Sequence, residues 1–108
     1  MKTIYTICVE VNDDGFIDSD KCFEDPGLAN IYLRKIVANT ICSLRKRGFT
    51  IKYINGDNSS LKDNEYPVIY EIGGLNSTTY KWERYDFRVK ATILFNSEKE
   101  FSNFPIQF

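Results

Sequence analysis

The chain has 108 residues, of which 43% are hydrophobic and 15% aromatic, and its 14 basic and 15 acidic residues leave a net charge of −1. This length and apolar content suit one hydrophobic core, so we expect a single domain spanning residues 1–108. The near-zero net charge excludes the broad electrostatic attraction of a strongly basic nucleic-acid binder, so only local patches of charge can attract a partner. The sequence contains no histidine, which excludes Ser-His and Cys-His nucleophile arrangements.

The N-terminal segment alternates in character, with Tyr5, Ile7 and Val9 on one side, and this pattern predicts a half-buried strand over residues 3–11. Residues 12–15 read NDDG, which tolerates positive φ and favours a hairpin turn. A short returning strand is therefore predicted to begin at residues 16–17.

A long helix is predicted over residues 26–47. Asp25 can cap its N-terminus, Pro26 suits the first helical position, and Gly48 supplies a left-handed residue at the end. Apolar residues recur at steps of three and four and predict the core stripe: Leu33, Ile36, Val37, Thr40, Ile41 and Leu44. The basic residues 45–47 complement the negative end of the helix dipole.

Three further strands are predicted after the helix, over residues 49–54, 66–72 and 81–95. Pro67 places the second of them at an edge or a bulge, and Gly73 begins the turn that follows it. The third alternates over its whole length, so it is predicted to have one core face and one wet face. The polar stretch between the first two has the composition of a loop.

These elements predict an α+β fold, in which an antiparallel sheet of four to five strands packs on one long helix in the order β-(β)-α-β-β-β. The order resembles the topology of cystatin-like single-helix sheets, but the chain has no signature residues of that inhibitor family. The aromatic tail over residues 97–108 is expected to fold back over the sheet or to pair with another chain. An edge strand over residues 66–72 and this tail permit a monomer or a homodimer.

The stretch EVNDDGFIDSDKCFED, residues 10–25, is strongly acidic. When Gly15 is aligned with the turn glycine of an EF-hand, Lys21 falls where the bidentate Glu is required, so we interpret the stretch as an acidic hairpin turn and predict no metal site. The acidic side chains could instead face a basic partner, with ordinary solvation as the alternative. The candidate binding residues of this patch are Asp13, Asp14, Asp18 and Asp20.

The solvent-exposed face of the strand over residues 81–95 is predicted to carry one aromatic ring and three cationic side chains in a row, with Asp86 among them. The candidate binding residues of this basic row are Trp82, Arg84, Arg88 and Lys90. Such a row could stack bases and hold phosphates, or bind an acidic protein surface. The alternative is cross-strand charge pairing, with Trp82 covering the edge of the sheet.

The cysteines and one pair of glutamates are weaker candidates for a functional site. Cys8, Cys22 and Cys42 are odd in number and widely spaced, which is typical of reduced thiols that pack in the fold. Glu71 and Glu83 could meet across a hairpin as an acid and base, but so short a chain offers little wall for a substrate cleft. We therefore expect no catalytic residues and no cofactor.

The sequence thus favours a small, cytoplasmic, non-enzymatic protein that acts by binding another protein. No apolar run approaches the length of a membrane span, so no membrane association is expected. In profile the chain resembles small phage-encoded antagonists of bacterial defence systems, which implies an inhibitory role. Two alternatives remain open: a nucleic-acid-binding module that uses the basic row, and a protein that binds or sequesters a small anionic ligand such as a nucleotide.

Overall fold

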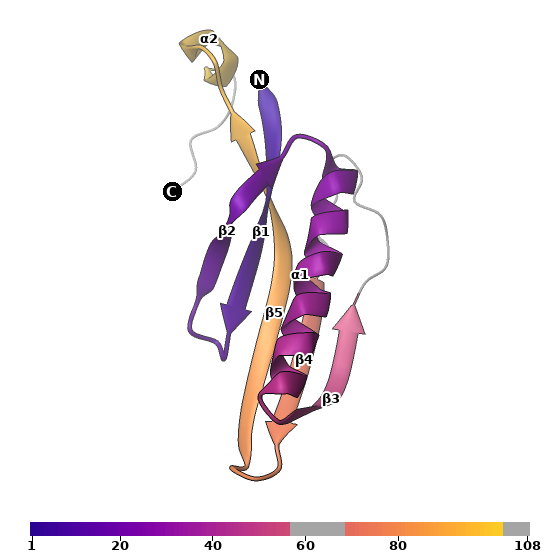
Figure 1. Cartoon of the computed structure of the whole chain (residues 1–108). Helices are drawn as coiled ribbons and strands as arrows, with labels where there is room; N and C mark the ends of the chain where they lie inside the picture. The colour runs from indigo at the N-terminus through magenta and orange to yellow at the C-terminus, as the bar shows by residue number, and fades with distance from the viewer. Residues whose placement is uncertain (57–68, 103–108) are drawn as a thin grey trace.

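The computed structural model of the chain describes residues 1–56 and 69–102. A five-stranded antiparallel sheet in the order β2-β1-β5-β4-β3 packs against one long helix, α1, which lies on one face of the sheet (Figure 1). The elements in chain order are β1 (Lys2–Val11), β2 (Phe16–Phe23), α1 (Pro26–Lys46), β3 (Phe49–Gly56), β4 (Ile69–Asn76), β5 (Lys81–Leu94) and the short α2 (Glu98–Phe101). The predicted α+β class and element order are confirmed.

The ends of α1 follow from its flanking residues. The carboxylate of Asp25 accepts a 2.8 Å hydrogen bond from the backbone N–H of Gly27, which satisfies one of the free donors of the first turn. At the other end Gly48 has φ +85 and donates its N–H to the carbonyl of Arg45 at 3.1 Å. This positive φ suits glycine because it has no Cβ.

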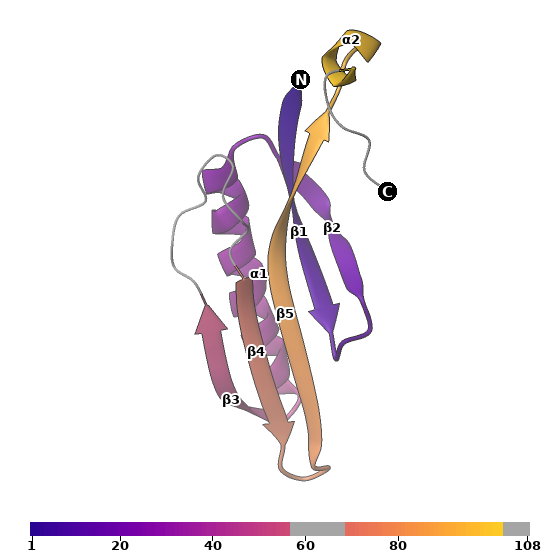
Figure 2. The same ribbon diagram turned by 180° about the vertical axis from the view of Figure 1, so that it is seen from behind.

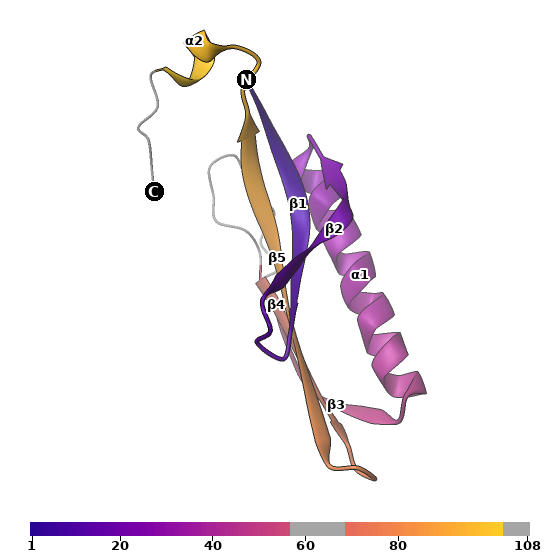
Figure 3. The same ribbon diagram turned by 90° about the vertical axis from the view of Figure 1, so that its left-hand side faces the viewer.

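The hydrophobic core lies between α1 and the sheet. Figure 3 shows the two layers from the side, with α1 against one face. The largest fully buried side chains come from both layers: Phe87, Ile7, Leu33, Leu44, Ile72 and Val89. Each such burial stabilises the fold by roughly 1.5–3 kcal/mol.

Strand β2 is longer than predicted and reaches Phe23. The ladder pairs Thr6 with Cys22 and Cys8 with Asp18, so Ile7 alone lies opposite residues 19–21. This irregularity breaks the alternating pattern of β2, which explains why the sequence did not reveal its second half.

The expectation that residues 66–72 form an edge strand is wrong, because β4 lies between β5 and β3, whereas β2 and β3 form the edges. Gly73, expected in a turn, instead lies inside β4. A Cβ at Gly73 would collide with the ring of Tyr53. The glycine therefore allows the Tyr53 ring to lie directly against the backbone of β4. Pro67 lies outside the described residues.

Both edge strands are irregular. The ladder of β2 shifts between Thr6 and Cys8, and the ladder of β3 shifts between Ile51 and Tyr53. Bulges at edge strands are one of the ways in which proteins hinder pairing with a further strand.

The far end of β5 does not have the predicted core face. Its partners in β1 reach Lys2, but Ile93 and Leu94 are each 43% exposed. The following α2 was not predicted; its residue Glu100 binds the N-terminal ammonium of Met1 at 2.6 Å. Residues 103–108 of the aromatic tail lie outside the described residues. Among the helices that are described, none combines the length and apolar character required to cross a membrane.

Candidate functional site

The face of the sheet opposite α1, here called the outer face, carries the predicted basic row. Figure 2 views the molecule from this side, with α1 behind the strands. Strand β5 lies at the centre of the sheet, and its buried residues Phe87 and Val89 face the core. The alternate residues therefore face outward, and they are Trp82, Arg84, Asp86, Arg88 and Lys90. The prediction that these side chains share one face is confirmed by the strand register.

Arg84 ties β5 to the turn between β1 and β2. Its guanidinium forms one ion pair with Asp13 and a second, 3.7 Å from Nε to Oδ2, with Asp86. The backbone N–H of Arg84 donates to Oδ1 of Asn12, and the backbone N–H of Asn12 donates to the carbonyl of Arg84, both at 2.8 Å. The neighbouring Asp13 carboxylate raises the pKa of Arg84, which stays charged. The turn and β5 are thus held together by backbone and side chain.

A second group of contacts lies nearer the middle of the outer face. Asp18 of β2 accepts a hydrogen bond from the thiol of Cys8 and another from Lys90 Nζ, each 3.1 Å long. The Cys8 bond, followed by the Lys90 bond, lowers the pKa of Asp18. Burial, reinforced by the Asp18 hydrogen bond, raises the pKa of Cys8 to about 11, so this residue is a neutral thiol at pH 7.

The acidic patch and the basic row therefore meet in two separate ion pairs. Asp13 and Asp18, predicted to face a basic partner, neutralise Arg84 and Lys90 within the same molecule. Cross-strand charge pairing, the alternative for the basic row, occurs in the structure. The other candidates, Asp14 and Asp20, are exposed and form no ion pair with any residue in the described ranges 1–56 and 69–102, and Arg88 is exposed opposite Cys8.

One end of the outer face carries a cluster that sequence reasoning identified only in part. Trp82 is 56% exposed and pairs across the strands with Leu75. The next outward position of β5, Arg84, lies opposite Gly73, and the ring of Tyr53 lies against that glycine. Tyr53 was missed because its position depends on the register of β3 with β4. The glycine inside a strand pattern was the available signal of a close approach.

Three carboxylates meet on the outer face in a way that could suit a hard cation. Oxygens of Glu10, Asp13 and Asp86 lie within 4.8 Å of one another. Arg84 forms ion pairs with two of the three, so its guanidinium already supplies a positive charge to this group. The EF-hand arrangement is contradicted independently, because Asp18 and its neighbours lie in strand β2 instead of a calcium loop.

Glu71 and Glu83, which could have met across a hairpin, lie on opposite faces of the sheet. Glu71 pairs with Asp86 and so shares the outer face, whereas Glu83 pairs with Gly74 and lies on the side of α1. Arg47 binds Glu83 there and lowers the pKa of its carboxyl group. The interpretation of the cysteines is correct for Cys8 alone, since Cys22 and Cys42 are exposed.

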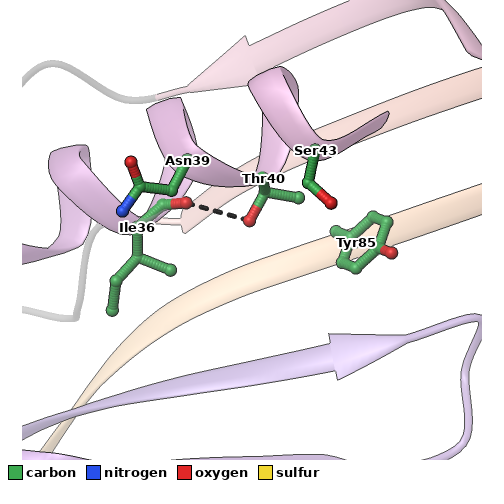
Figure 4. A pocket seen from close by; sticks show the side chains of 5 residues that line it. All are labelled: Ile36, Asn39, Thr40, Ser43 and Tyr85. Atoms are coloured by element: carbon green, nitrogen blue, oxygen red, sulfur yellow. Dashed lines mark hydrogen bonds between the residues drawn. The ribbon is translucent and has the colours of Figure 1, made fainter. Parts of the chain in front are cut away.

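A cavity of about 290 Å³ lies between α1 and β5, as Figure 4 shows. Its lining residues are Ile36, Asn39, Thr40, Ser43 and Tyr85. The hydroxyl of Thr40 is turned back to donate to the carbonyl of Ile36 at 2.9 Å. None of these residues is a cation, so this cavity lacks the arginine contact that the anionic-ligand interpretation requires.

No protein-family model, curated protein or solved structure matches this chain. A functional interpretation therefore depends on the geometry of the described residues.

Proposed function

We propose that this protein is a non-enzymatic module that binds another protein through the outer face of its sheet. The observation that supports this most directly is the grouping of Trp82, Arg84 and Tyr53 at one end of that face. Tryptophan, tyrosine and arginine are the residue types most enriched among interface hot spots. The charged network beside them supplies the polar rim that usually surrounds such a centre.

The cluster is preorganised, which reduces the entropic cost of binding. Arg84 is held by two carboxylates and Tyr53 lies against a glycine. Trp82 projects from β5, a strand that pairs with β4 on one side and with β1 on the other. Side chains that are already ordered lose less rotamer entropy when a partner binds.

The charge pairing favours a protein partner over a nucleic acid. A phosphate backbone binds through cations that release counterions, but Arg84 and Lys90 are already neutralised by carboxylates. A face with alternating donors and acceptors fits a polypeptide surface better. Inhibition of a partner, as in small phage-encoded antagonists of bacterial defence systems, is one form that this binding would take.

The test is affinity capture from lysate of the native host, with and without nuclease, compared between the wild-type protein and Trp82→Ala. We expect a stoichiometric protein partner that survives nuclease and binds Trp82→Ala at least about tenfold more weakly, as for a hot-spot residue. Ile17→Ala is the matched control, since Ile17 is 70% exposed and pairs with Val9 on the side of α1. Recovery of nucleic acid without a protein partner would refute the proposal. Equal loss of partner binding in Trp82→Ala and Ile17→Ala would also refute it.

A further inference from the structure

The chain separates acidic and basic residues along its sequence. Residues 10–25 contain seven acidic residues and one lysine, whereas α1 contains no acidic residue at all. The four basic residues of α1 are exposed, and they are Arg34, Lys35, Arg45 and Lys46. The helix is therefore a purely basic element in a chain whose net charge is −1.

The spacing of these cations places them in two rows. Positions 34 and 45 are separated by about three helical turns, so Arg34 and Arg45 lie along one border of the solvent-exposed side, roughly 16.5 Å apart. Lys35 and Lys46 repeat this spacing along the other border. Between the rows lie the exposed residues Ile31, Ala38 and Cys42. We call these seven residues the solvent face of α1.

The fold does not require this arrangement. The helix dipole accounts for Arg45 and Lys46 in the last turn, but Arg34 and Lys35 lie in the middle of the helix, where the dipole gives no preference. Within residues 1–56 and 69–102 none of the four cations forms an ion pair. By contrast, Arg47, Arg84 and Lys90 in the same molecule all bind carboxylates.

We propose that the solvent face of α1 docks an acidic amphipathic segment of a partner protein. Its carboxylates would meet the two rows of cations, and its small apolar side chains would pack between the rows on Ile31, Ala38 and Cys42. Ile31 is 52% exposed, and the small Ala38 and Cys42 let a second backbone approach closely. Apolar centres with charged borders are typical of helix pairing, in which the borders select the partner.

A nucleic acid and a membrane fit this face less well. A phosphate backbone has no apolar surface to pack on the apolar centre between the cations. A membrane-surface helix needs several large apolar residues such as Trp, Phe and Leu, whereas Ile31 is accompanied at this centre only by the small Ala38 and Cys42. The site lies on the opposite side of the molecule from the outer face of the sheet, so the protein would bridge two partners.

The experiment uses a synthetic helical peptide that carries two Glu-Glu pairs eleven residues apart, with alanine and leucine between them. The comparison peptide has the same composition with the pairs seven residues apart. We expect the full-length protein to bind the first peptide at low salt at least about tenfold more tightly than the second, because only the first matches both rows. Binding is measured by fluorescence anisotropy of a labelled peptide.

Two variants and one control locate the binding. Arg34→Gln/Lys35→Gln should weaken binding at least about fivefold, and Ala38→Glu, which puts a carboxylate at the centre of the face, should abolish it. Lys21→Gln/Lys52→Gln removes the same charge from exposed positions in β2 and β3 and should leave binding within about twofold. Circular dichroism confirms that each variant is folded.

The proposal is overturned by any of three results. These are no binding of the first peptide, equal binding of both peptides, and unchanged binding by Ala38→Glu. Tighter binding of a 20-base-pair DNA duplex or of phosphatidylserine vesicles, lost in Arg34→Gln/Lys35→Gln, would assign the face to phosphate instead. Trp82→Ala should bind the peptide normally, so failure of this site and failure of the outer face are distinguishable.

Discussion

Arg47 donates a hydrogen bond to each carboxylate oxygen of Glu83, with Nη1 3.0 Å from Oε1 and Nη2 2.7 Å from Oε2. Arg47 caps the end of α1, and Glu83 lies on β5, so this pair fixes the last turn of the helix to the sheet. The hydroxyl of Tyr85 joins it, accepting from Arg47 at 3.1 Å and donating to Glu83 at 2.9 Å. The guanidinium also lies 5.1 Å from the centre of the Phe49 ring.

We predict that Glu83→Gln lowers the free energy of unfolding by about 1 kcal/mol, because it removes the charge from a bidentate pair that is only partly exposed. Arg47→Lys should cost a similar amount, since lysine cannot form the two parallel hydrogen bonds. Urea denaturation monitored by Trp82 fluorescence provides the measurement. Glu98→Gln, at the start of α2, is the control and should change little; equal effects of Glu98→Gln and Glu83→Gln would contradict the role of the pair.

The three cysteines should separate by reactivity. Cys22 and Cys42 are exposed, whereas Cys8 is 3% exposed and its pKa is raised to about 11, so little Cys8 thiolate exists at pH 8. We expect two thiols to react quickly with a disulfide reagent in the native protein and the third to react only on unfolding. Cys8→Ser should leave the two fast reactions unchanged. Three equally fast thiols would show that Cys8 is accessible.

Alkali should also destabilise the protein through Cys8. The stability that the neutral thiol contributes is present below the unfolded pKa near 9.0 and is lost as the pH rises through the folded value of about 11. Cys8→Ala should therefore show a weaker loss of stability between pH 9 and 11 than the wild type in urea denaturation. An identical pH dependence of the two proteins would contradict the raised pKa.

Acid should destabilise the protein through Asp18 and Glu83, whose pKa values are both lowered in the folded state. A carboxylate of this kind contributes stability above its unfolded pKa of about 4 and loses it as the pH falls through the lower folded value. We expect the urea midpoint to fall between about pH 4.5 and pH 2.5, and to fall less in Asp18→Asn. Asp20→Asn removes a neighbouring exposed carboxylate and should behave like the wild type.

Gly48 should be the least replaceable residue of the turn between α1 and β3. Its φ of +85 is unfavourable for residues with a Cβ, so we predict that Gly48→Ala lowers the free energy of unfolding by roughly 1 kcal/mol. Gly48→Asn should cost less, because asparagine tolerates this region better. Thermal unfolding of both variants gives the comparison, and a higher stability for alanine than for asparagine would contradict the backbone argument.

Local patterns in the sequence were sufficient for the elements whose signals are regular. The alternation around Phe87 predicted β5, and Asp25, Pro26 and Gly48 predicted both ends of α1 within one residue. These signals depend only on neighbours in the chain and on which face is buried. The same reasoning predicted too short a strand for β2 and wrongly placed Gly73 in a turn. A bulge and a ring packed on a glycine leave no regular period in the sequence.

The candidate site shows the same division. The sequence by itself determined that Trp82, Arg84, Arg88 and Lys90 share one face, since alternate residues of a strand point the same way. It also determined that α1 is basic and residues 10–25 are acidic.

Only the tertiary structure decided that Arg84 meets Asp13 and Lys90 meets Asp18, across 71 and 72 residues of chain. The physical reason is that β1 pairs with the distant β5 as well as with its sequence neighbour β2, and the strand order of a sheet is set by the packing of the whole core. The structure also shows that Arg34, Lys35, Arg45 and Lys46 form no ion pair with any residue in the described part of the chain, whereas the outer face carries paired charges.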